Sequence, residues 1–110
     1  LPGSAFAGCT ALQEVVLPGD VQVIGEYAFF NCTALTTVNL SQVTWINLNA
    51  FDECTSLEML ILDNVTEIGR EAFYGCTSLK TLKIPKQKCV KQSLQYGQFV
   101  NLFFRHSDAL

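Results

Sequence analysis

The stretch AFDECTSLEMLIL, residues 50–62, decides the fold because it recurs three more times without a gap. The other copies are AFAGCTALQEVVL at 5–17, AFFNCTALTTVNL at 28–40 and AFYGCTSLKTLKI at 72–84, with starts 23, 22 and 22 residues apart. They share the pattern A-F-x-x-C-T-[AS]-L-x-x-[VL]-x-[LI]. A Val-x-x-Ile pair follows each of the first three copies: Val21/Ile24, Val43/Ile46 and Val65/Ile68. A constant period of this length indicates a solenoid of stacked coils.

The Leu-x-x-Leu-x-Leu element within each copy predicts how the coils stack. Its last two positions are two residues apart, so both side chains point to one face of a strand. A single coil cannot bury that face, whereas coils stacked about 4.8 Å apart would pair their strands and merge their apolar residues into one core. We therefore expect an α/β-type leucine-rich-repeat solenoid. A parallel sheet forms its concave face, and short strands with 3₁₀ or helical turns form its convex side.

Individual repeat slots predict local features. The four Phe residues after the first Ala should form a ladder through the core, and the A-F-x-x-C segment is short enough for one helical or 3₁₀ turn. Gly25 and Gly69 follow the Ile, where the chain must bend, and Asn47 takes this slot in one coil. Because Asn tolerates left-handed backbone, the exchange is consistent with a turn.

The pattern resembles the BspA-like leucine-rich repeats, whose unit runs close to L-x-x-I-x-I-P-x-x-V-x-x-I-G-x-x-A-F-x-x-C-x-x-L. The resemblance covers residues 1–90, which we interpret as about four repeats from the end of a longer array. The pattern fades after Ile84, so residues 91–110 are expected to be a degenerate last coil or a C-terminal cap. The resemblance implies a cell-surface or secreted protein with a role in adhesion, and a cytoplasmic location stays open.

Composition and charge exclude several classes of function. The chain of 110 residues suits one domain, and no apolar run approaches the roughly 18 residues needed to insert into a membrane. Its net charge of −3 argues against nucleic acid as a partner. Residues 1–69 hold eight acids and no Lys or Arg, whereas 70–110 hold seven basic residues and two acids. This asymmetry reflects either solvated faces or a dipolar rod whose basic end docks on an acidic surface.

The candidate chemical groups do not form a catalytic site. Four cysteines occupy one repeat slot, which favours a column of buried thiols over disulfides or a zinc site: Cys9, Cys32, Cys54 and Cys76. Cys89, beside Lys88 and Lys91, is the cysteine that we expect to be most reactive. A Cys89–His106 dyad would be the basis of an enzyme, but no motif supports it. We predict no enzymatic activity, no cofactor and no metal.

The strand residues that alternate with the core should point outward from the concave sheet. They form two columns: Glu14, Thr37, Met59 and Thr81, and Val16, Asn39, Ile61 and Lys83. Exposed apolar residues beside polar ones are typical of an interaction patch. We predict a non-catalytic module that binds a protein partner through these columns, and the alternative is a structural spacer with recognition elsewhere. The first coil would also present an uncapped sheet edge, which invites edge-to-edge self-association.

Overall fold

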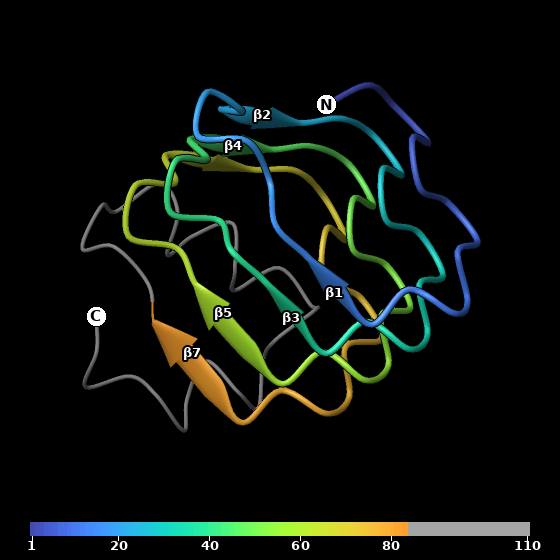
Figure 1. The fold of residues 1–110 in the computed structure, drawn as a ribbon. Coiled ribbons are helices and arrows are strands. Elements are labelled where there is room, and N and C mark those ends of the chain that lie inside the picture. The colour runs from blue at the N-terminus through green and yellow to red at the C-terminus, as the bar shows by residue number, and fades with distance from the viewer. Residues whose placement is uncertain (84–110) are drawn as a thin grey trace.

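The computed structural model describes residues 1–83 and consists of stacked coils (Figure 1). We number the coils 1 to 4 from the Ala that begins each repeat copy. The predicted last coil or cap, together with Cys89 and His106, lies outside the described residues. Seven short strands follow one another along the chain: β1 (Glu14–Val15), β2 (Val23–Ile24), β3 (Thr37–Val38), β4 (Trp45–Ile46), β5 (Met59–Ile61), β6 (Glu67–Ile68) and β7 (Thr81–Lys83).

Odd-numbered and even-numbered strands form opposite walls of the solenoid (Figure 1). Strands β2, β4 and β6 form one parallel sheet, in which Ile24, Ile46 and Ile68 are in register. On the other wall, β1 pairs with β3 and β5 pairs with β7, and both pairs are parallel. The predicted stacking of short parallel strands is therefore confirmed.

The odd-numbered wall is not one uninterrupted ladder, because no ladder joins β3 to β5 although they lie side by side. Coil 2 differs from coil 3 at the residue after Val38. The Oδ1 atom of Asn39 accepts a hydrogen bond from the backbone N–H of Ser41 at 3.0 Å, a local turn that competes with strand pairing. Strand β3 ends at Val38, as β1 ends at the equivalent Val15, whereas β5 continues to Ile61.

A stack of phenylalanine rings runs along the core, as predicted. Ring centroids are 5.4 Å apart for Phe6 and Phe29, 5.0 Å for Phe29 and Phe51, and 5.3 Å for Phe51 and Phe73. Interplanar angles of 9–10° make each pair a parallel stack. The spacing is close to that of adjacent strands because each coil contributes one ring. Phe29, Phe51 and Phe73 are fully buried, and Phe6 at the first coil is partly buried.

The A-F-x-x-C segments form turns, and the described residues contain no α- or 3₁₀-helix, so the helical turn is not confirmed. One left-handed residue precedes each segment, and another is the fourth residue of the segment. For the coil 2 segment these are Tyr27 with φ 58° and Asn31 with φ 61°, backbone angles that a right-handed helix cannot include. Successive N–H groups also alternate in direction. Phe29 donates to Ala50 of the next coil at 2.7 Å, while Phe30 donates locally, to Tyr27 three residues earlier, at 3.1 Å.

Close approach between coils, and not left-handed backbone, explains the glycine slot after the Ile. Gly25, Asn47 and Gly69 are absent from the residues with positive φ, so the expected left-handed turn at this slot is wrong. A Cβ atom on Gly69 would lie 2.4 Å from the backbone nitrogen of Leu48, in the preceding coil. Asn47 occupies the slot differently, since its Nδ2 donates a hydrogen bond across the seam to the carbonyl of Ile24 at 3.2 Å.

Candidate interaction face

The eight residues predicted to face outward are all exposed. In the first column, Glu14 is in register with Thr37, and Met59 is in register with Thr81. In the second column, Ile61 and Lys83 are in register within strands, whereas Val16 and Asn39 directly follow the ends of β1 and β3. Strand alternation therefore places both columns as the sequence predicts. Whether they bind a partner is a separate question, addressed below.

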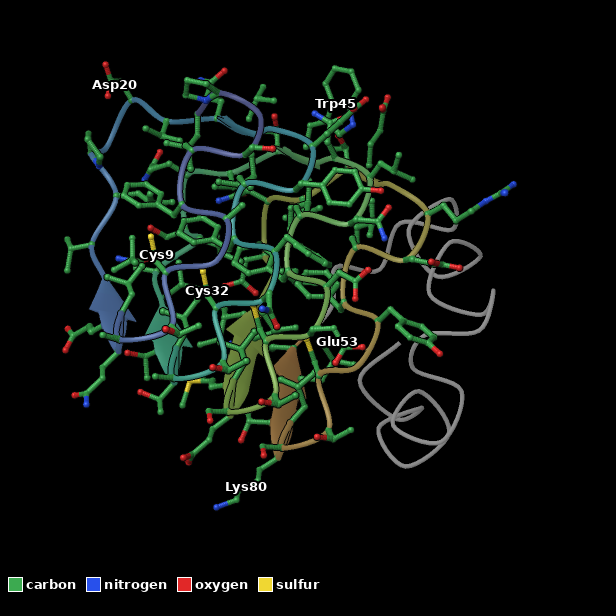
Figure 2. All side chains as sticks on the ribbon, turned by 90° about the vertical axis from the view of Figure 1, so that its right-hand side faces the viewer. Cys9, Asp20, Cys32, Trp45, Glu53 and Lys80 are labelled. Carbon is green, nitrogen blue, oxygen red and sulfur yellow. The ribbon has the colours of Figure 1, made fainter. Side chains whose placement is uncertain are left out.

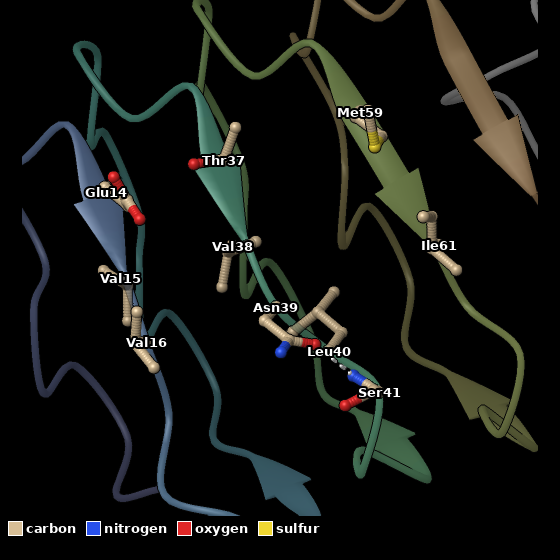
Figure 3. A pocket seen from close by; sticks show the side chains of 10 residues that line it. All are labelled: Glu14, Val15, Val16, Thr37, Val38, Asn39, Leu40, Ser41, Met59 and Ile61. Atoms are coloured by element: carbon tan, nitrogen blue, oxygen red, sulfur yellow. Dashed lines mark hydrogen bonds between the residues drawn. The ribbon is translucent and has the colours of Figure 1, made fainter.

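Six of these eight residues line a depression of about 430 Å³ on the odd-numbered wall, which we call the concave depression (Figure 3). Thr81 and Lys83, both on β7, do not line it. The complete lining is Glu14, Val15, Val16, Thr37, Val38, Asn39, Leu40, Ser41, Met59 and Ile61. The structure thus brings together side chains from three successive coils.

Four lining residues were not predicted as part of this surface: Val15, Val38, Leu40 and Ser41. Strand alternation assigns Val15 and Val38 to the core, and the equivalent residues Leu60 and Leu82 are indeed buried. Val15 and Val38 are only partly buried, in the two-residue strands β1 and β3. Ser41 stands in a slot that holds Pro in the first and fourth repeats, and this exchange is the signal that could have identified it.

The concave depression is mainly apolar and carries a single charged residue. Val16 is 76% exposed, Met59 43% and Ile61 39%. Glu14 is the charged member of the lining. Within residues 1–83, the ion pair recorded joins Lys80 to Glu58 at 3.7 Å and does not involve Glu14. Both partners of that pair are well exposed, so the pair contributes little to stability.

A second, smaller hollow of about 130 Å³ adjoins the concave depression at Asn39 and Ser41, which line both. Its remaining lining residues come from coils 1 and 2: Leu17, Pro18, Gly19, Val21, Gln42 and Val43. The two hollows meet between coil 1 and coil 2, and the larger one extends to Met59 and Ile61 of coil 3. We call the two hollows together the coil 1–2 seam.

The cysteine column lies inside the solenoid, and the four described cysteines are free, as predicted. Each of the last three thiols donates a hydrogen bond to the Phe carbonyl of the preceding coil. Cys32 reaches Phe6 at 3.1 Å, and Cys54 reaches Phe29 at 3.1 Å. Burial raises the pKa of Cys32 and raises that of Cys54 to about 12. These thiols therefore stay protonated at neutral pH, a state suited to packing and not to nucleophilic chemistry.

Residues 1–83 contain no group of three or more His, Cys, Asp or Glu side chains that could hold a metal ion. In the same residues, no helix is long and apolar enough to cross a membrane.

The even-numbered wall carries a second group of exposed apolar residues that the sequence interpretation missed. Val23 and Trp45 are in register on β2 and β4, at 37% and 43% exposure. Figure 2 shows Trp45 projecting from the outside of this wall. Both residues precede a buried Ile, so the alternation that identified the concave columns could have identified them. Neither residue lines the concave depression or the adjoining hollow.

Coils of 22–23 residues, stacked parallel strands and a continuous ladder of equivalent core residues define a leucine-rich-repeat solenoid. A family model described as BspA type Leucine rich repeat region (6 copies) matches residues 1–102. The chain belongs to this family. A search of curated proteins finds no match.

Three solved structures are similar to this chain. A leucine rich cell surface protein from Faecalibacterium prausnitzii A2-165 is 32% identical with a TM-score of 0.72, over 80% of this chain and 25% of that protein's. The T. pallidum Leucine Rich Repeat protein is 30% identical with a TM-score of 0.58, over 77% and 51%. A leucine-rich repeat protein from Bacteroides ovatus ATCC 8483 is 30% identical with a TM-score of 0.58, over 76% and 28%. The chain therefore spans between a quarter and about half the length of these proteins.

Proposed function

We propose that this chain is a non-catalytic module that binds a protein partner through the concave depression. The observation that carries the proposal is the exposure of Val16, Met59 and Ile61 around one depression. When a partner covers large apolar side chains that are exposed to water, the free energy falls by about 25 cal/mol for each Å² of apolar surface buried. Polar Thr37 and Asn39 lie between them, which is the mixed composition of known interfaces.

We further propose that the module acts at the cell surface or in a secreted protein. The similar F. prausnitzii structure is described as a cell surface protein, and it supplies the support for this location. The partner's identity and any role in adhesion belong to the same proposal.

The test compares capture of partners from host and matrix extracts by three baits. The first is the unaltered chain, and the second carries Val16→Lys, Met59→Lys and Ile61→Glu. The third is a matched control that carries Val23→Lys, Trp45→Lys and Tyr74→Glu, the same charge change at exposed apolar residues away from the depression. Circular dichroism must show that all three are folded.

Binding through the concave depression predicts a partner that the unaltered chain and the control retain and that the depression variant loses. A partner retained equally by all three baits, or no partner at all, would favour the alternative of a structural spacer. Loss with the control alone would instead identify the even-numbered wall as the binding surface.

A further inference from the structure

The charge around the coil 1–2 seam is of one sign. Residues 1–69 hold eight acids and no Lys or Arg. Glu14 lines the concave depression, and Asp20 lies between Gly19 and Val21, which line the adjoining hollow. Glu14 is thus an acidic lining residue of the seam, and Asp20 is the sequence neighbour of two lining residues. Figure 2 shows Asp20 on the first coil, well separated from Lys80 beside β7.

These two carboxylates have no internal counter-charge within residues 1–83. The ion pair recorded there joins Lys80 to Glu58, on coils 4 and 3. Glu14 and Asp20 are both exposed, so they are available to a partner. Carboxylates in this position attract cationic groups and steer their approach.

The floor of the seam offers hydrogen bonding as well as apolar area. Asn39 uses its Oδ1 to accept from Ser41, and no described group accepts from its Nδ2. That amide stands where the two hollows meet, since Asn39 lines both. An amide donor between apolar side chains suits the backbone carbonyl of a bound peptide segment.

We propose that the occupant of the coil 1–2 seam is a polypeptide segment of a separate protein, with an apolar centre flanked on both sides by Lys or Arg. This inference rests on the proposed function and specifies its partner. The apolar centre covers Val16, Met59 and Ile61, and the flanking cations pair with Glu14 and Asp20. A segment flanked by acids is rejected by like-charge repulsion.

The test is selection of a random twelve-residue peptide phage library on the immobilised 110-residue chain. A charge-reversed variant, Glu14→Lys with Asp20→Lys, is selected in parallel. The matched control is Glu26→Lys with Glu67→Lys, which changes net charge by the same amount at exposed acids that neither line the seam nor adjoin its lining residues in the sequence. Thermal unfolding of all three proteins establishes that they are folded.

The unaltered chain should enrich peptides with Lys or Arg on both sides of an apolar core. Affinity of a selected peptide should fall about five- to tenfold in the charge-reversed variant, because two exposed ion pairs are lost. It should change less than about twofold in the control, and should weaken as salt screens the pairs.

Four outcomes would overturn the inference. Enriched peptides without basic residues that are nevertheless lost on Met59→Lys with Ile61→Glu would refute the charge requirement and leave the proposed function intact. Enriched acidic peptides would refute it directly. Peptides that bind the unaltered chain, both charge variants and the Met59→Lys with Ile61→Glu variant equally, or no enrichment, would remove both the inference and the proposed function. Self-association of the chain that the charge reversal abolishes would make the occupant a second copy and not a separate protein.

Discussion

Replacing Phe51 by Leu tests whether the stacked rings set the stability of the solenoid. Phe51 is fully buried and stacks on two rings, Phe29 at 5.0 Å and Phe73 at 5.3 Å. Each such pair contributes about 0.5–1.5 kcal/mol beyond the area that it buries. Leu fills most of the volume but cannot stack, so Phe51→Leu should lower the free energy of unfolding by about 1–3 kcal/mol from these pairs.

Phe6→Leu provides the matched comparison, because Phe6 occupies the same repeat slot but stacks on one ring. Its substitution should cost about half as much as that of Phe51. The measurement is unfolding in guanidinium chloride followed by circular dichroism, with the free-energy difference taken from the midpoint and slope. Equal losses at Phe51 and Phe6, or a negligible loss at Phe51, would refute the assignment of stability to ring stacking.

Two further predictions concern the seams and the thiols. Gly69→Ala should destabilise the chain by about 1–3 kcal/mol, because the new methyl group overlaps the backbone of Leu48. Gly19→Ala is the control and should be neutral or slightly stabilising, because no atom lies within 4 Å of the added Cβ. Equal melting temperatures for the two variants would contradict the close approach at Gly69. Burial raises the pKa of Cys54 from 9.0 to about 12, so the thiol stays protonated to a higher pH in the folded state than in the unfolded chain. Its contribution to stability is complete below pH 9 and is lost as pH rises from 9 to about 12, by up to about 1.4 kcal/mol per pH unit. The unfolding midpoint should be lower at pH 10 than at pH 7.5, and Cys54→Ala should reduce this difference. A midpoint that does not change with pH would contradict a contribution of the buried thiol to stability.

The repeat in the sequence determined the stacking of the coils and the contents of the core. Equivalent slots at a constant period must lie above one another when coils stack, so one alignment predicts the ladder of Phe51 and its neighbours, the column of Cys54 and the parallel strands. The two-residue alternation likewise predicts that Met59 and Ile61 face outward, because successive side chains of a strand point to opposite faces. Both interpretations use information within a few residues of each slot.

Only the tertiary structure decided how neighbouring coils adjust to one another. The repeat pattern is the same in coils 2 and 3, yet β3 ends before the Asn39 turn, and the ladder between β3 and β5 is missing. The depression, with partly buried Val15 and Val38 in its lining, is assembled from three coils. Left-handed backbone at Tyr27 likewise accompanies hydrogen bonds to the next coil, which replace those of a helical turn. Side-chain periodicity specifies which face a residue occupies. These features depend instead on the local Asn39–Ser41 hydrogen bond and on hydrogen bonds and contacts between residues about one repeat apart.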